Sequence, residues 1–428
     1  MADMTPFDPA IAVAIEKLET TGTKKQWWYL LGLALSVMVG GLSSVCIKQL
    51  LLPIQTSQLA PHDTNTAFTL VASIGALAGL LASPLVGALS DRTSLRSGRR
   101  RPWLVGGIAS AVLGMSIMAF ASSIPVLLLG EIFAQIGVDT VLAITTAVIP
   151  DQIPLSQRPF ISACVGMAPN VGGVIGLLLV ARLTDTRIIA QGYLLVAAVS
   201  LCCVLAFLLI LREPPVAPEE LPPPFHLGSF LVSFVQPLRA KDFRLTFASR
   251  CCAYLSFTIL GAYTLFYLRG VLHEALPLAA MHVANFQLLS TAVLIVFAFV
   301  AGWFSKRTGQ IKLFVISGAC GMALGLVVIV AIPTWTALLV AAVLFGAGFG
   351  LFLGVDIALA IRVLPSEQAR AKDLGLMYNA IYLPLILSPL IGAGVLNTFH
   401  NNFALLFAIA ALASVLSAVL IAPITSVR

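Results

Sequence analysis

The sequence predicts an all-α membrane protein of about twelve transmembrane helices in two pseudo-symmetric six-helix bundles. Hydrophobic residues make up 59% of the 428 residues and charged residues only 10%, whereas a soluble domain has about 25% charged residues. The apolar residues are gathered into runs that can cross a bilayer, which takes roughly 20 residues. Lipid is therefore the expected solvent of most of the chain. Repeated loop motifs divide the runs into two sets of six.

Twelve apolar runs are predicted as spans because each is bounded by charged or turn-forming residues. The polar residues 1–26 are predicted to lie in the cytoplasm. Residues 212–248 contain acidic residues and prolines, and they are predicted as a cytoplasmic linker between one bundle, 27–211, and the other, 249–428. The predicted spans are 27–52, 66–89, 103–122, 126–149, 159–182, 190–211, 249–268, 280–303, 313–332, 334–360, 374–396 and 403–423.

The basic residues predict the orientation of the chain. With a cytoplasmic N-terminus, 21 of the 25 Lys and Arg residues fall in cytoplasmic segments, as the positive-inside rule requires. An even number of spans then places both termini in the cytoplasm. We expect the protein to be a multi-pass protein of the cytoplasmic (inner) membrane.

Two loop motifs recur at corresponding places in the two predicted bundles. Gly87–Thr93, after the second span, is matched by Gly302–Thr308 after the eighth. Pro154–Arg158, after the fourth span, is matched by Pro365–Arg370 after the tenth. Repeats of this kind surround a binding site at half depth in many secondary transporters.

The stretch Gly87–Pro102 resembles the loop signature of the major facilitator superfamily, G-x-x-x-D-R-x-x-x-x-R-R. Its form here, with Gly-Arg-Arg-Arg-Pro-Trp after Ser-Asp-Arg, is similar to the sucrose-transporter and glycoside–pentoside–hexuronide branch and its bacterial relatives. Residues 371–380 are also similar to that branch. The resemblance implies alternating access, usually coupled to protons or sodium. Sucrose transporters resemble one another in a fourth-span acidic residue; Gln135 stands at that place, and Asp139 follows one turn later.

The loop signature is interpreted as a conformational latch that holds one face of the protein in one state and releases it in the other. Glycines suit a short, sharp turn, and Asp91 can pair with nearby arginines or face a helix N-terminus. The alternative is a plain positive-inside anchor, which requires neither Asp91 nor the glycines. The predicted latch residues are Gly87, Asp91, Arg92, Gly98, Arg99, Arg100, Arg101, Asp151, Arg158, Lys306, Arg307 and Asp373.

Ionisable side chains at half depth in a membrane are costly and are therefore functional candidates. Asp139 is the leading candidate because it lies near the middle of the fourth span, where Gln135 shares its helical face. We expect Asp139 to handle a proton or the substrate; a structural carboxylate paired with Lys48 is the alternative. Lys48 either extends to the interface or forms a gate or an ion pair. Asp356 either lines the inner cavity or pairs with Arg362.

Amides and tyrosines inside the spans are further candidates because sugar sites combine a few hydrogen-bonding groups with aromatic surfaces. Glu131 begins the fourth span near the outer face and is expected to be structural. Glycines repeated every four residues, as in Gly346–Gly354, are interpreted as helix-packing positions. The predicted cavity residues are Asp139, Gln135, Lys48, Asp356, Tyr263, Asn170, Gln287, Tyr378, Asn379 and Tyr382.

These features predict a secondary active transporter, with proton-coupled symport of a sugar or glycoside as the leading hypothesis. An efflux antiporter for drugs or other lipophilic solutes is the alternative, and a sensor without transport activity also fits the sequence. An enzyme is not expected, because the chain lacks the common zinc, P-loop and nucleophile-elbow motifs. The expected partners are a small-molecule substrate, a co-transported proton or sodium ion, and the bilayer. We expect a monomer without cofactor, metal or nucleic acid.

Overall fold

The computed structural model describes the backbone of residues 9–95, 98–152, 158–183, 188–211, 213, 239–364 and 370–424. Side chains are described within the narrower ranges 28–95, 98–149, 161, 165–183, 189–211, 213, 239–364, 376–377 and 380–424. In these parts of the chain the regular structure is helical, with one isolated bridge between Leu95 and Gly98.

The helices follow one another along the chain with short connections. Their bounds are α1 Pro9–Cys46, the π-helical turn η1 Ile47–Leu51, α2 Leu52–Leu59, α3 Thr64–Ser90, α4 Arg101–Ala119, α5 Ile124–Gln152, α6 Arg158–Ala181, α7 Ile188–Ile210, α9 Lys241–Gly270, α10 Leu276–Thr308, α11 Ile311–Ala331, α12 Trp335–Arg362, α13 Arg370–Thr398 and α14 Phe403–Ile421.

Within the described residues, eleven helical stretches are long and apolar enough to cross a membrane. The first of them, Trp28–Leu59, joins α1, η1 and α2 into one span, and α6 contributes the shorter apolar stretch Val165–Ala181. Each falls on one of the twelve predicted runs. The all-α membrane fold predicted from the sequence is thus confirmed.

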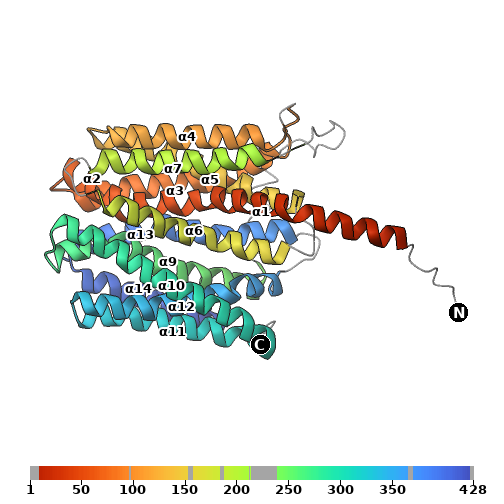
Figure 1. Ribbon diagram of the computed structural model, residues 1–428. Helices are drawn as coiled ribbons and strands as arrows, with labels where there is room; N and C mark the ends of the chain where they lie inside the picture. Colours follow the sequence, from red (N-terminus) through yellow and green to blue (C-terminus); the bar gives the residue numbers. More distant parts are fainter. Residues whose placement is uncertain are drawn as a thin grey trace.

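The helices form two bundles whose members pack in the same way. In the first bundle α5 packs on α3 and α4, and α1 packs on α6 and α7. In the second, α12 packs on α10 and α11, and α9 packs on α13 and α14. Figure 1 shows the first bundle above the second, with α6 and α13 where they meet. The internal repeat seen in the loop motifs therefore extends to helix packing.

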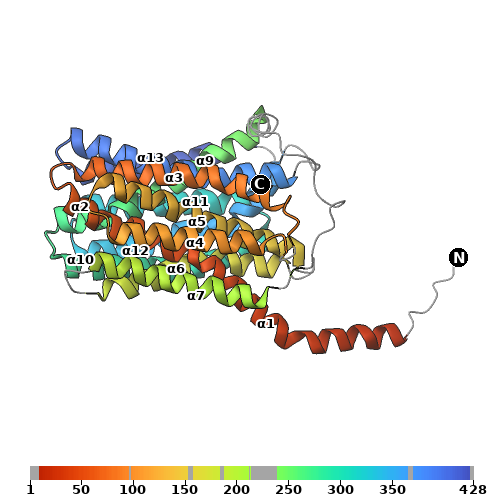
Figure 2. The ribbon, with the colours of Figure 1, turned by 90° about the horizontal axis from the view of Figure 1, so that it is seen from above.

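Several helices extend beyond the predicted spans. α9 begins at Lys241, before the predicted boundary at residue 249. Its first turns carry the charged Lys241, Asp242 and Arg244, so the apolar run used to predict the span does not include them. The first span continues through polar residues to Leu59. In addition, α1 begins at Pro9, and Figure 2 shows its N-terminal part extending away from the bundles.

Glycines let helices approach closely within each bundle, as the four-residue spacing predicts. A Cβ atom at Gly346, Gly350 or Gly354 of α12 would overlap a backbone carbonyl oxygen of α10. At Gly172 of α6 it would overlap the carbonyl oxygen of Met38 of α1. These contacts confirm the packing interpretation of the glycines.

We name the two ends of the bundles by the residues they carry. The arginine end carries Arg92 and Arg99–Arg101, and the far end carries the turns at 60–63 and 399–402. Both bundles meet through α3 against α13 and α6 against α10.

The α3–α13 contact is closed by hydrogen bonds from the far end inward. Asn65 Nδ2 donates to Asn397 Oδ1 at 3.0 Å and to Asn401 Oδ1 at 3.1 Å. Deeper in the protein, Thr69 Oγ1 donates to the Pro389 carbonyl at 2.7 Å, and Ser73 Oγ donates to the Ile386 carbonyl at 3.0 Å. These bonds join the two bundles along α3 and α13 at the far end.

We predict that Gly350→Ala destabilises the second bundle by about 1–3 kcal/mol, because the added methyl group overpacks the α10–α12 contact. The measurement is the thermal unfolding midpoint of the purified protein in detergent. Gly394→Ala is the matched control, since a Cβ there meets nothing within 4 Å. Equal midpoints for the two variants would contradict the packing role of Gly350.

Candidate functional site

Asp139 of α5 lies where the two bundles meet and accepts hydrogen bonds from both. Gln135 Nε2, one turn earlier on the same helix, donates to Asp139 Oδ2 at 2.8 Å. Tyr382 Oη of α13 donates to Asp139 Oδ1 at 3.3 Å. Asp139 is buried, with 4% of its surface exposed. The structure thus brings together three of the predicted cavity residues.

A second polar group lies beside Asp139 in the first bundle. Lys48, in η1, and Glu131, two turns before Asp139 on α5, line one small cavity together with Gln135 and Ser43. The cavity has a volume of about 10 Å³, which is close to the space one water molecule needs. Lys48 therefore shares this cavity with an acidic residue inside the first bundle.

Two glycines of α3 make room for the carboxylates of α5. A Cβ at Gly75 would lie 2.8 Å from Glu131 Oε1, and a Cβ at Gly79 would overlap Asp139 Oδ2. These two glycines, four residues apart, therefore leave space for the two carboxylate side chains in addition to letting the helices pack closely.

Asp356 forms a separate ionic site in the second bundle. Its Oδ2 lies 3.0 Å from Arg250 Nη2 of α9, and the two side chains are 3% and 5% exposed. The predicted alternative of a pair with Arg362 is wrong, because the partner is Arg250. The sequence did not single out Arg250, since it lies at the predicted edge of a span, where basic residues are common.

The remaining predicted cavity residues lie apart from Asp139. Tyr263 Oη donates to the Pro389 carbonyl at 3.1 Å, as does Thr69 Oγ1. Thr69 lies ten residues along α3 from Gly79, or about 15 Å at 1.5 Å per residue, and Gly79 is the residue that lies against Asp139. Tyr263 therefore lies near the far-end hydrogen bonds and away from Asp139. Gln287 is buried and donates to Thr291 Oγ1 at 3.1 Å.

Asn170 is half-buried in α6, next to Pro169, whose backbone packs against Gly41 of α1. The side chains of Tyr378 and Asn379 lie outside the described residues.

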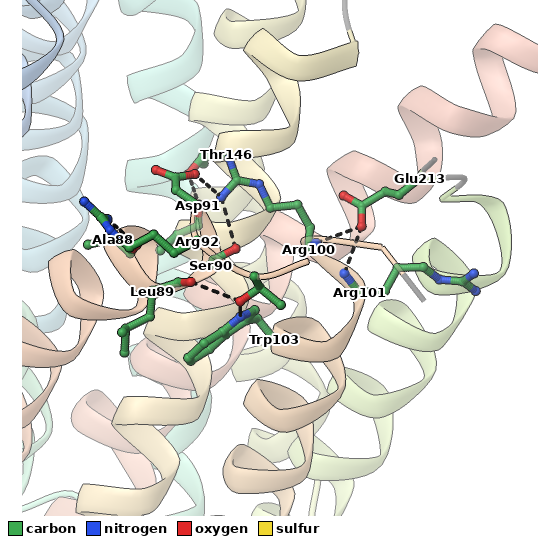
Figure 3. Close-up of polar contacts among 12 residues, drawn as sticks. Ala88, Leu89, Ser90, Asp91, Arg92, Arg100, Arg101, Trp103, Thr146 and Glu213 are labelled. Carbon is green, nitrogen blue, oxygen red and sulfur yellow. Dashed lines mark hydrogen bonds and ion pairs between the residues drawn. The ribbon is translucent and has the colours of Figure 1, made fainter. Parts of the chain in front are cut away.

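The arginine end holds a network of polar contacts, shown in Figure 3. Asp91 Oδ1 lies 2.8 Å from Arg100 Nη1, which also donates to Ser90 Oγ at 3.1 Å. Arg100 is buried, whereas the Asp91 side chain is 44% exposed. This ion pair joins the end of α3 to the start of α4.

Glu213 adds a contact that the sequence did not predict. Its Oε2 accepts from the backbone N–H of Arg100 at 2.8 Å and of Arg101 at 3.1 Å. A carboxylate is favoured at a helix N-terminus, here that of α4. Gly98 has φ +103° and leaves the space that Glu213 occupies. The sequence signal for this contact is an acidic residue just after the sixth span, within the stretch predicted as a linker.

The other predicted latch residues are distributed over both bundles. Arg92 Nη1 donates to the Ala88 carbonyl at 2.6 Å, and Arg101 Nη2 donates to the Leu208 carbonyl at 3.0 Å. Arg307 lies over the Trp303 ring at 3.9 Å from its centroid. Lys306 is exposed, Arg99 is half-buried, and a Cβ at Gly87 would meet nothing within 4 Å. The side chains of Asp151, Arg158 and Asp373 lie outside the described residues.

Comparison with known proteins gives one family over nearly the whole chain. The family model described as "Major Facilitator Superfamily" matches residues 29–292 and again 275–427. The general alpha-glucoside permease of Schizosaccharomyces pombe is 27% identical over a stretch covering 24% of this chain and 22% of the permease. The match thus spans about a fifth of that permease.

Solved transporter structures share the fold at low sequence identity. A mutant of the nucleoside transporter NupG has a TM-score of 0.74 at 15% identity, covering 91% of this chain and 98% of its own. The peptide transporter POT in complex with sulfate has 0.73 at 15% identity, covering 92% and 94%. The D-xylose-proton symporter has 0.70 at 18% identity, covering 93% and 98%.

We predict that Arg250→Met destabilises the protein by about 3–5 kcal/mol, because it leaves the Asp356 carboxylate buried without its counter-charge. The double variant Arg250→Met/Asp356→Leu should recover most of this loss, because apolar replacements of both partners remove the unpaired charge. Thermal unfolding midpoints in detergent measure both effects. A double variant no more stable than the single one would contradict this account of the pair.

Proposed function

Because the chain belongs to the major facilitator superfamily and is a multi-pass membrane transporter rather than an enzyme, we propose that it is a proton-coupled symporter of a sugar or glycoside. In this proposal Asp139 carries the proton, and the bundles open alternately to the two sides of the membrane. The small-molecule substrate binds between them, and the protein works as a monomer.

The observation that carries the proposal is the position of Asp139 between donors from both bundles. An ionised carboxylate accepts strong, charge-assisted hydrogen bonds, so it favours the arrangement in which Tyr382 of α13 lies against α5. Protonation turns one oxygen into a donor and weakens its role as an acceptor. Binding of a proton would therefore change the free energy of the contact between the bundles, which is what coupling requires.

The groups around Asp139 also suit a polyhydroxylated substrate. A carboxylate, an amide from Gln135 and a phenol from Tyr382 together offer several donors and acceptors to sugar hydroxyls. The names of two similar proteins, an alpha-glucoside permease and a D-xylose-proton symporter, agree with this substrate class.

The proposed orientation places the arginine end in the cytoplasm, with both termini there. It rests on the positive-inside distribution of Lys and Arg. The latch at that end would hold the α3–α4 turn through the Asp91–Arg100 ion pair and release it when the bundles move.

The test is uptake into proteoliposomes that contain the full-length protein, with radiolabelled maltose and sucrose as the first substrates of a glycoside panel. With an imposed gradient of about one pH unit, a symporter that moves one proton per sugar can accumulate a neutral sugar about tenfold. Uptake that stops at equal concentrations, or that responds to a sodium gradient instead, would contradict proton coupling.

We predict that Asp139→Asn reduces this accumulation from about tenfold to equal concentrations, because an amide cannot carry the proton. Exchange of labelled for unlabelled sugar should continue, since it needs no net proton movement. Asp63→Asn, the same change at an exposed position in the far-end turn, is the control and should accumulate sugar as the wild type does. Accumulation by Asp139→Asn at the wild-type level would contradict the role of Asp139.

We predict that Asp91→Asn slows transport in both exchange and accumulation but leaves the amount of protein in the membrane unchanged. The Asp91 side chain is 44% exposed and Arg100 keeps its hydrogen bond to Ser90 Oγ in the variant, so we expect the fold to be retained, whereas the latch acts in every cycle. Initial rates per molecule of reconstituted protein measure the effect. Wild-type rates would leave Asp91 as part of a plain positive-inside anchor.

An efflux antiporter for lipophilic solutes is the second candidate, and a cluster of aromatic rings between α9 and α12 favours it. Phe257 stacks on Phe349 with centroids 4.5 Å apart, and Tyr254 meets both Phe349 and Phe352 edge to face. Such rings would suit an apolar substrate. Protection of cells from drugs, without sugar uptake by proteoliposomes, would favour this candidate.

A further inference from the structure

Glu131 is a buried carboxylate whose oxygens have no hydrogen-bond partner among the described residues. Only 1% of its surface is exposed. A buried carboxylate is stable only if it is protonated or lies near an opposite charge. The sequence-based expectation that Glu131 is a structural residue near the outer face does not account for this environment, because a structural carboxylate would accept hydrogen bonds.

The opposite charge comes from Lys48, which is placed by an irregular turn. η1 interrupts the first span with five π-helical residues, directly before Pro53 in the first turn of α2. Pro53 has no backbone N–H to donate, and π-helical turns are frequent at functional sites. Lys48 lines the same cavity as Glu131, and its charge acts on both Glu131 and Asp139.

Glu131, Gln135 and Asp139 follow one another at four-residue intervals and share one face of α5. The distance along the helix from the first to the last is about 12 Å. Glu131 lies nearer the far end, since α5 begins there at Ile124. Gln135 lines the cavity beside Glu131 and also donates to Asp139, so it connects the two carboxylates.

The other described groups that the structure brings to the two carboxylates are uncharged. α7 brings the Tyr193 hydroxyl, which has no hydrogen-bond partner among the described residues, close to Glu131. α3 brings Gly75 and Gly79, and α13 brings the Tyr382 hydroxyl to Asp139. With Lys48 positive, this buried group is neutral when one of the two carboxylates holds a proton.

We propose that Glu131 and Asp139 share one transported proton, with Glu131 as the carboxylate that receives it from the far end and Lys48 as the counter-charge of the ionised one. The inference rests on the proposed function. In the transfer, the O–H bond of the Glu131 carboxyl group breaks and an O–H bond forms on Asp139. A water molecule in the small cavity takes the first step, and further water molecules must enter beside Gln135 to complete the path, because Asp139 does not line that cavity. Glu131 is then the anion that faces Lys48, so no net charge is created in the interior.

The test is Glu131→Gln in the full-length protein, reconstituted as above with radiolabelled maltose. With a gradient of about one pH unit, accumulation should fall from about tenfold to equal concentrations, while exchange of labelled for unlabelled maltose stays near the wild-type rate. Glu274→Gln is the matched control, because Glu274 lies in a far-end turn and bonds His282. It should accumulate maltose as the wild type does.

Infrared difference spectra recorded after a pH step test the shared proton without any substrate. The carbonyl band of protonated carboxyl groups should change shape in both Glu131→Gln and Asp139→Asn, because each variant restricts the proton to the other residue. A band that is unchanged in Glu131→Gln would overturn the inference.

The transport outcomes separate this inference from the proposed function. Wild-type accumulation by Glu131→Gln would overturn the role of Glu131 and leave that of Asp139 intact. Loss of exchange together with accumulation in Glu131→Gln would also overturn it, because it would assign Glu131 to the structure of the bundle. A wild-type protein that accumulates no sugar in a proton gradient would overturn the proposed function itself.

Discussion

The hydrogen bonds that Asp139 accepts from Gln135 and Tyr382 are the interaction on which the arrangement of the two bundles at half depth depends. A carboxylate without water must have donors or a counter-charge. Here one donor comes from its own helix and the other from the opposite bundle. The chemistry of one side chain is thereby tied to the relative position of two halves of the protein.

The two bundles repeat the same packing but carry different chemistry. Counting back by the same number of residues from Pro154 and Pro365 pairs Asp139 with Gly350. The first bundle has a carboxylate at this place, for which Gly79 of α3 leaves space, whereas the second has a glycine against the backbone of α10. Counting back from the same two prolines also pairs Thr145 with Asp356. Thr145 bonds Ser36 at 2.8 Å as a neutral pair, where the second bundle has the Arg250–Asp356 ion pair.

Much of the fold could be predicted from the sequence because lipid imposes a simple rule, a run of about 20 apolar residues for each span. Neighbours on one helix could also be predicted, as for Gln135 and Asp139, since the four-residue spacing fixes their common face. Contacts between helices could not be predicted, because they depend on how each helix is rotated. The bonds from Tyr382 to Asp139 and from Arg250 to Asp356 are of this kind. The π-helical turn at Lys48 has no sequence pattern beyond the proline that follows it.

The polar contacts at the two ends of the protein are of different kinds. At the far end neutral amides join the two bundles, as Asn65 does with Asn397, whereas at the arginine end the Asp91–Arg100 ion pair joins α3 to α4 within the first bundle. Dissolved ions screen contacts between exposed charges and have little effect on neutral ones. Ionic strength therefore acts more on the α3–α4 turn of the first bundle than on the contact between the bundles at the far end.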